Sequence, residues 1–384
     1  MPATIPRIAF LSRGALGERA PVTVPAIQRL LDLEARGKLR IGPNILPDVL
    51  PEIPPELSQS CHALVCRPTW GGKVTSELVE RLRTPGQRFV VATLSAADSH
   101  IALEDASVPV IKATTGNTRQ TAELTIFLAI CILRRAQFSL LNMGFGVYAR
   151  PDVSRTRSLK GLTWTVLGPG SIGTSVLALA EAMGVGALRG YHPGMCSEKI
   201  AQIRRDFPVV PDSVEWTSDL VAAVADADVV SIHVPLTAST RQMIGAALLA
   251  HLRPSAVLVN MARHDLVDET ALINALEDNR LAGYAADVLP EHAEHHGANP
   301  YVPPVPVWRR ACWDSVSSIG HCTHEASVFQ DSTLAETFLS PAPSGETNLV
   351  LTPHIGGSTW DAESSVADEV IDALLTRLGI AEAP

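Results

Sequence analysis

Short apolar, β-branched runs recur along the chain and alternate with segments of helical spacing or with prolines, a pattern typical of parallel α/β proteins. A first series predicts strands at residues 8–12, 62–67, 88–94 and 108–114. A second series predicts strands at residues 163–168, 186–191, 227–235, 255–260, 282–288 and 348–353. Helices are expected between them, for example over residues 171–183 and 269–279. We therefore expect one α/β unit over residues 1–117 and a second, doubly wound domain after it.

Two later segments depart from this alternation. Residues 360–378 carry Val366, Val370, Leu374 and Leu375 at helical spacing, which predicts an amphipathic helix that needs a surface to cover. Residues 292–348 are rich in proline and have no period, which favours a long excursion serving as a lid, a binding loop or a subunit arm.

The second series begins with a glycine turn, LGPGSIG at residues 167–173. In the spacing G-x-G-x-x-G, Gly168 permits a tight turn, Gly170 lets the backbone approach phosphates, and Gly173 lets the next helix pack closely on the strand. The helix that follows offers unpaired N–H groups to an anion. Because a strand precedes the turn and a helix follows it, we interpret it as a dinucleotide-binding turn.

Composition narrows the class of protein. With 384 residues and 46% hydrophobic content, the chain can bury the cores of two domains. Its net charge of −9 disfavours nucleic acid as a partner. No secretory signal is evident, and the apolar stretch 124–133 is too short to span a bilayer, so it is expected to be a buried helix. Six scattered cysteines fit a reducing compartment, and we expect a cytoplasmic protein without membrane contact.

Three charged or titratable residues follow predicted strands of the second series. Arg263 follows a buried run and suits a substrate carboxylate and its neighbouring carbonyl. His354 has the chemistry of a proton donor or acceptor, and Asp287 ends the strand between the other two. Ligands of open α/β sheets bind at the carboxyl ends of strands, so these positions indicate catalysis more than packing.

Six motifs in order resemble the D-isomer-specific 2-hydroxyacid dehydrogenases, in particular their phosphoglycerate dehydrogenase-like branch. They are GNTRQTAE (116–123), LGPGSIG (167–173), DVVSIHVPLT (228–237), VNMARHDLVDE (259–269), LAGYAADV (281–288) and LTPHIGGST (351–359). The resemblance implies two doubly wound parallel-sheet domains. A Rossmann nucleotide-binding domain over residues 118–358, with a long insertion at about 292–348, would be inserted in a flavodoxin-like substrate domain of residues 1–117 plus 359–384.

The resemblance also implies an activity and its residues. The chain would interconvert a 2-keto acid and a D-2-hydroxy acid with NAD(P), as a homodimer paired through the nucleotide-binding domain. Arg263 would bind the substrate and His354 would transfer the proton. The implied cofactor-binding residues are Gly168, Gly170, Ser171, Ile172, His192, His233, Pro235, Met261, Asp287 and Gly356; of these, His233 and Pro235 would line the adenosine side, and Asp287 would face the nicotinamide carboxamide.

Departures from the family pattern leave several points open. His192 stands where an acidic residue would bind the adenine ribose, so we expect NAD(H) to be preferred but NADP(H) to be possible. His292 stands where a glutamate would pair with His354 and raise its pKa. Glu291 is the first substitute and Glu294 the second.

The substrate pocket also departs from the pattern, because Ser95 and Ala96 replace part of a glycine-rich loop. Arg67 matches a position that binds substrate phosphate, which suggests a second anionic group on the substrate, although Arg67 has the alternative of a solvated surface charge. The histidines and cysteines of residues 292–324 lack metal-ligand spacing, so no metal site is expected. The competing hypothesis is a nucleotide-binding scaffold or sensor with little or no turnover.

Overall fold

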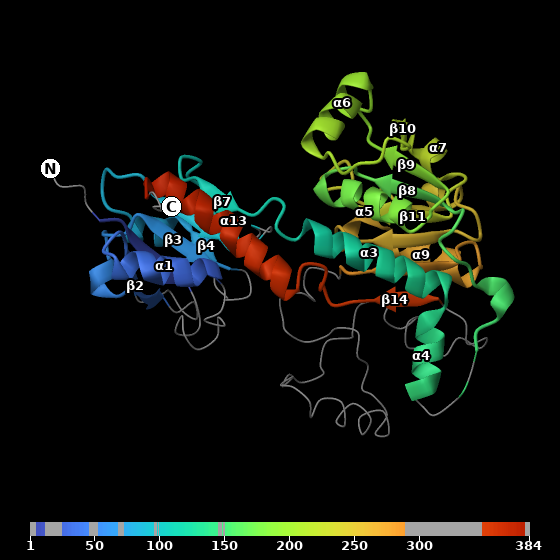
Figure 1. Cartoon of the computed structure of the whole chain (residues 1–384), viewed down its shortest axis with the longest axis horizontal. Coiled ribbons are helices and arrows are strands. Elements are labelled where there is room, and N and C mark those ends of the chain that lie inside the picture. The colour runs from blue at the N-terminus through green and yellow to red at the C-terminus, as the bar shows by residue number, and fades with distance from the viewer. Residues whose placement is uncertain are drawn as a thin grey trace. The chain divides into compact units, whose positions relative to one another are not determined.

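The computed structural model describes residues 5–11, 25–45, 53–67, 73–95, 98, 100–144, 148, 150–288 and 348–380. The chain divides into two compact units, one of residues 1–118 and 357–384 and the other of residues 119–356 (Figure 1). Almost all of the predicted insertion, residues 292–347, lies outside the described residues.

The first unit is built on a five-stranded parallel sheet in the order β2-β1-β3-β5-β7. This order is that of a doubly wound, flavodoxin-like sheet. Four strands were predicted, whereas β2 was not, because Gly42 and Pro43 interrupt its apolar pattern. A separate parallel pair is formed by β4 (Val74–Thr75) and β6 (Ile101–Ala102). The strands of the main sheet are β1 (Arg7–Leu11), β2 (Arg40–Ile45), β3 (Ala63–Cys66), β5 (Val90–Thr93) and β7 (Val110–Lys112).

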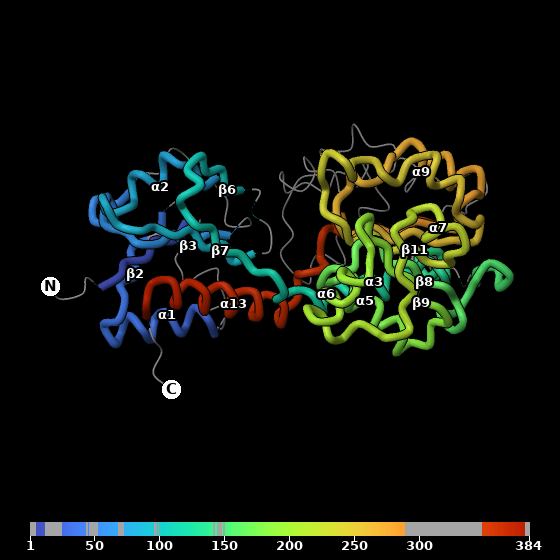
Figure 2. Tube along the Cα trace, turned by 90° about the horizontal axis from the view of Figure 1, so that it is seen from above, coloured from blue at the N-terminus to red at the C-terminus, as the bar shows by residue number. Residues whose placement is uncertain are grey.

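Helices cover both faces of this sheet. On one face α1 (Pro25–Ala35) and the terminal helix α13 (Trp360–Leu378) lie side by side (Figure 2) and bury their apolar residues against β1, β3 and β5. On the other face α2 (Ser76–Leu82) and η1 (Pro55–Leu57) pack against the same strands. The predicted terminal helix is therefore confirmed, and the surface that it covers is the sheet of the first unit.

Helix α13 also fixes the segment through which the chain leaves this unit. Glu369 accepts hydrogen bonds from the backbone N–H groups of Thr114, Thr115 and Gly116, at 2.7, 3.2 and 3.0 Å, and from both threonine hydroxyls. Burial raises the pKa of Glu369, but these bonds outweigh it and hold the pKa below its usual value. A Cβ on Gly116 would lie 2.7 Å from the backbone of Val366, so only glycine fits there.

The second unit is built on a seven-stranded parallel sheet in the order β10-β9-β8-β11-β12-β13-β14. Six of these strands were predicted, and the seventh, β10, is a short edge strand that the pattern did not indicate. Because every described pairing in both sheets is parallel, the predicted fold class is confirmed. The strands are β8 (Thr163–Leu167), β9 (Ala187–Tyr191), β10 (Glu215–Thr217), β11 (Val229–Ile232), β12 (Val257–Asn260), β13 (Gly283–Ala286) and β14 (Leu349–Leu351).

Two hydrophobic layers sandwich this sheet. One contains α3 (Thr118–Leu133), α5 (Ser171–Ala182) and α6 (Ser197–Asp206). The other contains α7 (Leu220–Val224), α8 (Ala246–Leu249) and α9 (Glu269–Glu277). The apolar stretch 124–133 is thus part of a helix packed on the sheet, as expected. Among the residues that the structure describes, no helix combines the length and the apolarity that crossing a bilayer demands.

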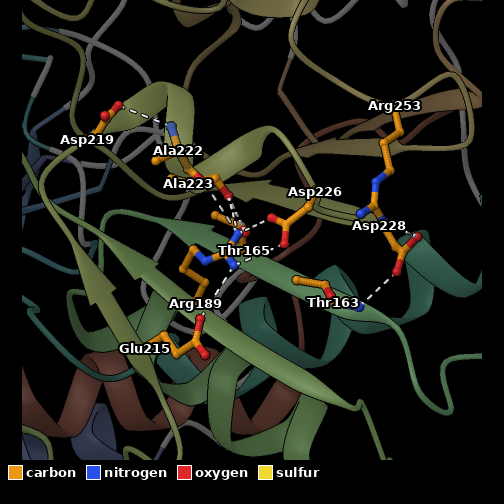
Figure 3. A network of polar contacts seen from close by, with 10 residues as sticks. All are labelled: Thr163, Thr165, Arg189, Glu215, Asp219, Ala222, Ala223, Asp226, Asp228 and Arg253. Carbon is orange, nitrogen blue, oxygen red and sulfur yellow. Dashed lines mark hydrogen bonds and ion pairs between the residues drawn. The ribbon is translucent and has the colours of Figure 1, made fainter.

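A network of polar contacts lies near the amino ends of β8 and β11 (Figure 3). The Asp228 side chain, only 8% exposed, accepts hydrogen bonds from Arg157 at 2.7 Å and from the Thr163 backbone N–H at 2.9 Å. In the same network Arg189 pairs with Asp226 and, at 3.4 Å, with Glu215, whose side chain is 69% exposed. The buried carboxylate therefore joins two strands and a loop, whereas Glu215 lies in solvent.

We expect Asp228→Ala to lower the free energy of unfolding by about 1–3 kcal/mol, because it leaves a half-buried guanidinium and a partly buried N–H without their acceptor. Glu215→Ala, in the same network, should cost less than about 1 kcal/mol because exposed ion pairs contribute little. Urea unfolding of both variants measures the difference. Equal losses would show that Asp228 does not anchor the sheet.

Candidate active site

The glycine turn follows β8 at the carboxyl edge of the second unit's sheet, and each of its glycines has a distinct steric reason. Gly168 has a φ of +93°, a backbone conformation that residues with a side chain rarely adopt. A Cβ on Gly173 would lie 2.4 Å from the Gly168 carbonyl oxygen, so the helix α5 could not pack there with a larger residue. A Cβ on Gly170 would meet nothing within 4 Å, which leaves open space beside the amino end of α5. This space and the helix N–H groups suit a pyrophosphate.

His233 follows β11 next to the glycine turn. Both of its ring nitrogens are shielded from solvent, and neither has a hydrogen-bond partner among the described residues. Burial lowers the pKa of His233 to about 3, so its imidazole is neutral. A shielded polar group without a partner costs free energy, and a bound ligand that supplied a partner would recover it. The residues of this edge therefore fit a dinucleotide.

His192 follows β9, where the ribose-binding carboxylate was expected. The Gly194 N–H donates to His192 Nδ1 at 3.0 Å, so the ring proton of neutral His192 is on Nε2. Burial, and then the charge of Lys199, lower the pKa of His192. The position thus holds a neutral N–H donor, whereas a carboxylate would accept hydrogen bonds from ribose hydroxyls.

Arg263 follows β12 and its side chain is exposed. The Asn260 side-chain N–H donates to the Arg263 carbonyl oxygen at 2.9 Å, while the Arg263 guanidinium donates to the Ala262 carbonyl oxygen at 2.6 Å. The backbone of Arg263 is therefore fixed. Among the described contacts, its guanidinium donates only to a neighbouring carbonyl, so further N–H donors can bind an anion.

Asp287 and the loop after β14 form a buried clamp. Only 2% exposed, Asp287 accepts hydrogen bonds from the Thr352 hydroxyl at 2.6 Å, the Ile355 N–H at 2.8 Å and the Gly356 N–H at 2.6 Å. Burial raises the pKa of Asp287, and these bonds together with the charge of His354 lower it, with the net direction upward. A Cβ on Gly356 would lie 2.8 Å from the Asp287 carboxylate.

The clamp holds His354 in an uncommon backbone conformation. Its φ is +55°, in the left-handed region that residues other than glycine seldom adopt. Such conformations persist where the surroundings enforce them, and they gather at functional sites. Because β12, β13 and β14 are adjacent and parallel, His354 lies at the same sheet edge as Arg263. The side chain of His354 is exposed there.

The remaining predicted residues divide into three groups. At the sheet edge, Ser171 and Ile172 open α5, Pro235 follows β11, and Met261 lies 3.5 Å from where a Gly356 Cβ would be. In the first unit, Ser95 follows β5, and Arg67 follows β3 and donates to Glu363 of α13 at 2.7 Å. Outside the described residues lie Glu291, His292, Glu294 and Ala96.

The sequence analysis missed three features, two at this sheet edge and one, the Arg67–Glu363 pair, in the first unit. Thr352 and the loop N–H groups bind Asp287 across 65 to 69 residues of sequence, a contact that no local spacing encodes. Glu363 is 296 residues from Arg67. His264, next to Arg263, lies between two carboxylates, and the adjacent acidic residues in RHDLVDE were a signal for it. Within the described ranges, no group of three or more His, Cys, Asp or Glu side chains is placed to hold a metal ion.

Comparisons with known proteins identify a family and a fold. Residues 126–356, more than half of the chain, match the family model for the "D-isomer specific 2-hydroxyacid dehydrogenase, NAD binding domain". D-3-phosphoglycerate dehydrogenase of Escherichia coli is 29% identical over 269 residues, which cover 70% of this chain and 52% of that protein. The chain spans about half the length of the curated relatives it matches.

Solved structures share the fold. The NAD-complexed D-isomer specific 2-hydroxyacid dehydrogenase of Lactobacillus delbrueckii ssp. bulgaricus superposes with a TM-score of 0.67 at 24% identity, covering 98% of this chain and 99% of that one. An acyclic imino acid reductase in complex with NADPH and D-Arg superposes with a TM-score of 0.63 at 18% identity, with 97% of each chain covered. At these identities the likeness concerns the fold.

Proposed function

The chain belongs to the D-isomer specific 2-hydroxyacid dehydrogenase family, and we propose from that premise that it interconverts a 2-keto acid and a D-2-hydroxy acid. The observation that carries the proposal is the arrangement of Arg263, Asp287 and His354 after three adjacent parallel strands, at the same edge as the glycine turn. A cationic carboxylate binder and an imidazole beside a nucleotide turn are what reduction of a keto acid requires.

In this mechanism the guanidinium of Arg263 binds the substrate carboxylate and polarises the adjacent carbonyl oxygen. His354 donates the proton that this oxygen acquires on reduction and removes it on oxidation. Asp287 holds the loop that carries His354 through its three hydrogen bonds. Glu291 is the proposed carboxylate partner of His354, with Glu294 the alternative.

The nicotinamide cofactor supplies the hydride when bound. Gly168, Gly170 and the amino end of α5 would hold its pyrophosphate, and His233 would gain the hydrogen-bond partner that it lacks. NAD(H) is the expected preference, since the matching family model describes an NAD-binding domain. NADP(H) is the alternative, because His192 removes the carboxylate that would repel a 2′-phosphate.

The substrate side chain is proposed to bear a second anionic group, for which Arg67 is the candidate binder. Because Arg67 already donates to Glu363 at 2.7 Å, that group would have to compete with a carboxylate. Substrates with and without a second anion therefore have to be compared directly.

The experiment follows the absorbance of NADH or NADPH while the protein is offered 2-keto acids, including phosphorylated, dicarboxylic and monocarboxylic members. Turnover of one or more acids, dependent on the protein, supports the dehydrogenase. Tight binding of NADH without consumption across the panel would contradict it and favour a nucleotide-binding scaffold.

We also propose a homodimer paired through the second unit. This unit exposes large apolar side chains on α3 and on α4 (Ala136–Gly144), with Phe127 55%, Leu140 68% and Met143 55% exposed. Large exposed apolar side chains on two consecutive helices are candidates for an interface. Sedimentation equilibrium should give twice the chain mass, and Leu140→Asp with Met143→Asp should weaken the dimer at least about 100-fold. An unchanged dimer would place the interface elsewhere.

A further inference from the structure

His264, the residue after Arg263, lies between two carboxylates. Its Nε2 is 3.1 Å from Oε2 of Glu269, in the first turn of α9, and its Nδ1 is 3.3 Å from Oδ1 of Asp265. The side chain of His264 is only 16% exposed. We call His264 with its two carboxylate partners, Glu269 and Asp265, the bracket. It ties the short helix η4 (His264–Leu266), which starts directly after Arg263, to the helix α9.

The number of N–H groups on the imidazole of His264 identifies the protonation state that fits this geometry. A neutral imidazole has one N–H, so one of the two carboxylates would face a ring lone pair, which repels it. An imidazolium has two N–H groups and satisfies both carboxylates at once. Burial lowers the pKa of His264, but Glu269 and Asp265 outweigh it, and the pKa is raised above its usual value.

The charged groups around the bracket are balanced. Arg241, in the loop after β11, forms an ion pair with Asp265. Two carboxylates, Asp265 and Glu269, are therefore matched by two cations, Arg241 and protonated His264. Loss of the proton from His264 would leave one carboxylate in excess beside the backbone of Arg263.

The backbone of Arg263 depends on this turn. Its carbonyl oxygen accepts from Leu266 N–H at 3.3 Å as well as from the Asn260 side chain, and the His264 carbonyl accepts from Val267 N–H at 3.1 Å. The turn that contains His264 therefore fixes the backbone from which the side chain of Arg263 extends.

We propose that His264 is a positioning residue for Arg263, and that its imidazolium, held by Glu269 and Asp265, keeps Arg263 placed for a 2-keto acid carboxylate. The inference rests on the proposed function for its ligand, although the imidazolium itself can be tested without activity. Because the folded state binds the proton more tightly than the unfolded chain, the bracket is complete below about pH 6.5 and is lost as the pH rises through the folded-state pKa of His264.

The first measurement is an NMR titration of protein labelled at its histidine rings, with His264→Gln identifying the resonance. His264 should titrate above about pH 6.5, the ordinary value for a histidine side chain. The exposed His251, which follows α8, is the position for a control substitution. In Glu269→Gln, which keeps the shape and removes one carboxylate, the titration of His264 should move to lower pH. Titration of His264 at or below about pH 6.5 would overturn the inference, whatever the activity of the protein.

The second measurement is calorimetric binding of oxamate, an unreactive analogue of a 2-keto acid, to the NADH-loaded protein across the same pH range. Oxamate affinity should fall about tenfold as His264 deprotonates, and the fall should occur at lower pH in Glu269→Gln. His264→Gln should bind weakly at every pH, whereas His251→Gln should behave like the unsubstituted protein. A pH profile that Glu269→Gln does not move would overturn the positioning role. If oxamate failed to bind at any pH while the NMR shifts were as expected, the proposed function would fail. The positioning of Arg263 for an acid would then fail with it, and only the protonation of His264 between its two carboxylates would stand.

Discussion

Replacing His354 with asparagine is expected to lower kcat for 2-keto acid reduction by about 10²–10⁴-fold, the range that general acid–base groups contribute. The physical reason is that the oxygen of the keto group acquires charge during reduction and needs a proton donor at that edge of the sheet. Asparagine can donate a hydrogen bond but cannot release a proton at neutral pH. The pH dependence of kcat should flatten together with the loss of rate.

Asparagine is the informative substitution because of the backbone at this position. The φ of His354 is +55°, and asparagine tolerates the left-handed region better than most side chains, whereas alanine adds strain. His354→Ala, made alongside, separates the two effects: similar kcat values in both variants assign the loss to the missing proton. Binding of NADH, followed by fluorescence, should be unchanged in both. A kcat for His354→Asn within about threefold of the unsubstituted protein would exclude His354 as the acid–base group.

Most of the strands that the sequence predicted are buried, although the exposed edge strand Val110–Lys112 was predicted as well. Central strands of a parallel sheet contact helices on both faces and so form continuous apolar runs, as Val229–Ile232 and Val257–Asn260 do. The two strands of the main sheets that the sequence did not predict are at sheet edges, where burial is partial and the pattern is broken. The short separate pair of Val74–Thr75 and Ile101–Ala102, with two residues in each strand, was not predicted either. Arg40–Ile45 contains a glycine and a proline, and Glu215–Thr217 has only three residues.

The candidate site shows the same division between local and distant causes. The glycine turn was predictable because one segment of seven residues contains the strand end, the turn and the helix start. The clamp of Asp287 on the His354 loop was not, since it depends on β13 and β14 being neighbours in the sheet although the long segment 289–347 separates them in sequence. Arg67 was interpreted from its position alone, and its ion pair with Glu363 exists only because α13 returns to cover the first sheet.

Replacing Arg263 with alanine is expected to lower kcat/KM by about 10²–10⁴-fold, because removing the partner of a charged group in a binding site costs about 3–5 kcal/mol. Arg263→Lys keeps the charge but lacks the planar fork that binds a carboxylate through two parallel N–H bonds. It should therefore recover only part of the loss, mainly in KM.

The matched control is Arg280→Ala, which removes an exposed arginine paired with Asp278 in the same unit and should leave kcat/KM unchanged. Steady-state kinetics with the best acid of the panel compare the three variants. If Arg263→Ala retained the activity of Arg280→Ala, the substrate carboxylate would have to be bound by another cation. The sheet edge formed by β12, β13 and β14 would then not be the active site. A loss confined to Arg263→Ala, with partial recovery in Arg263→Lys, would instead tie catalysis to the guanidinium that follows β12.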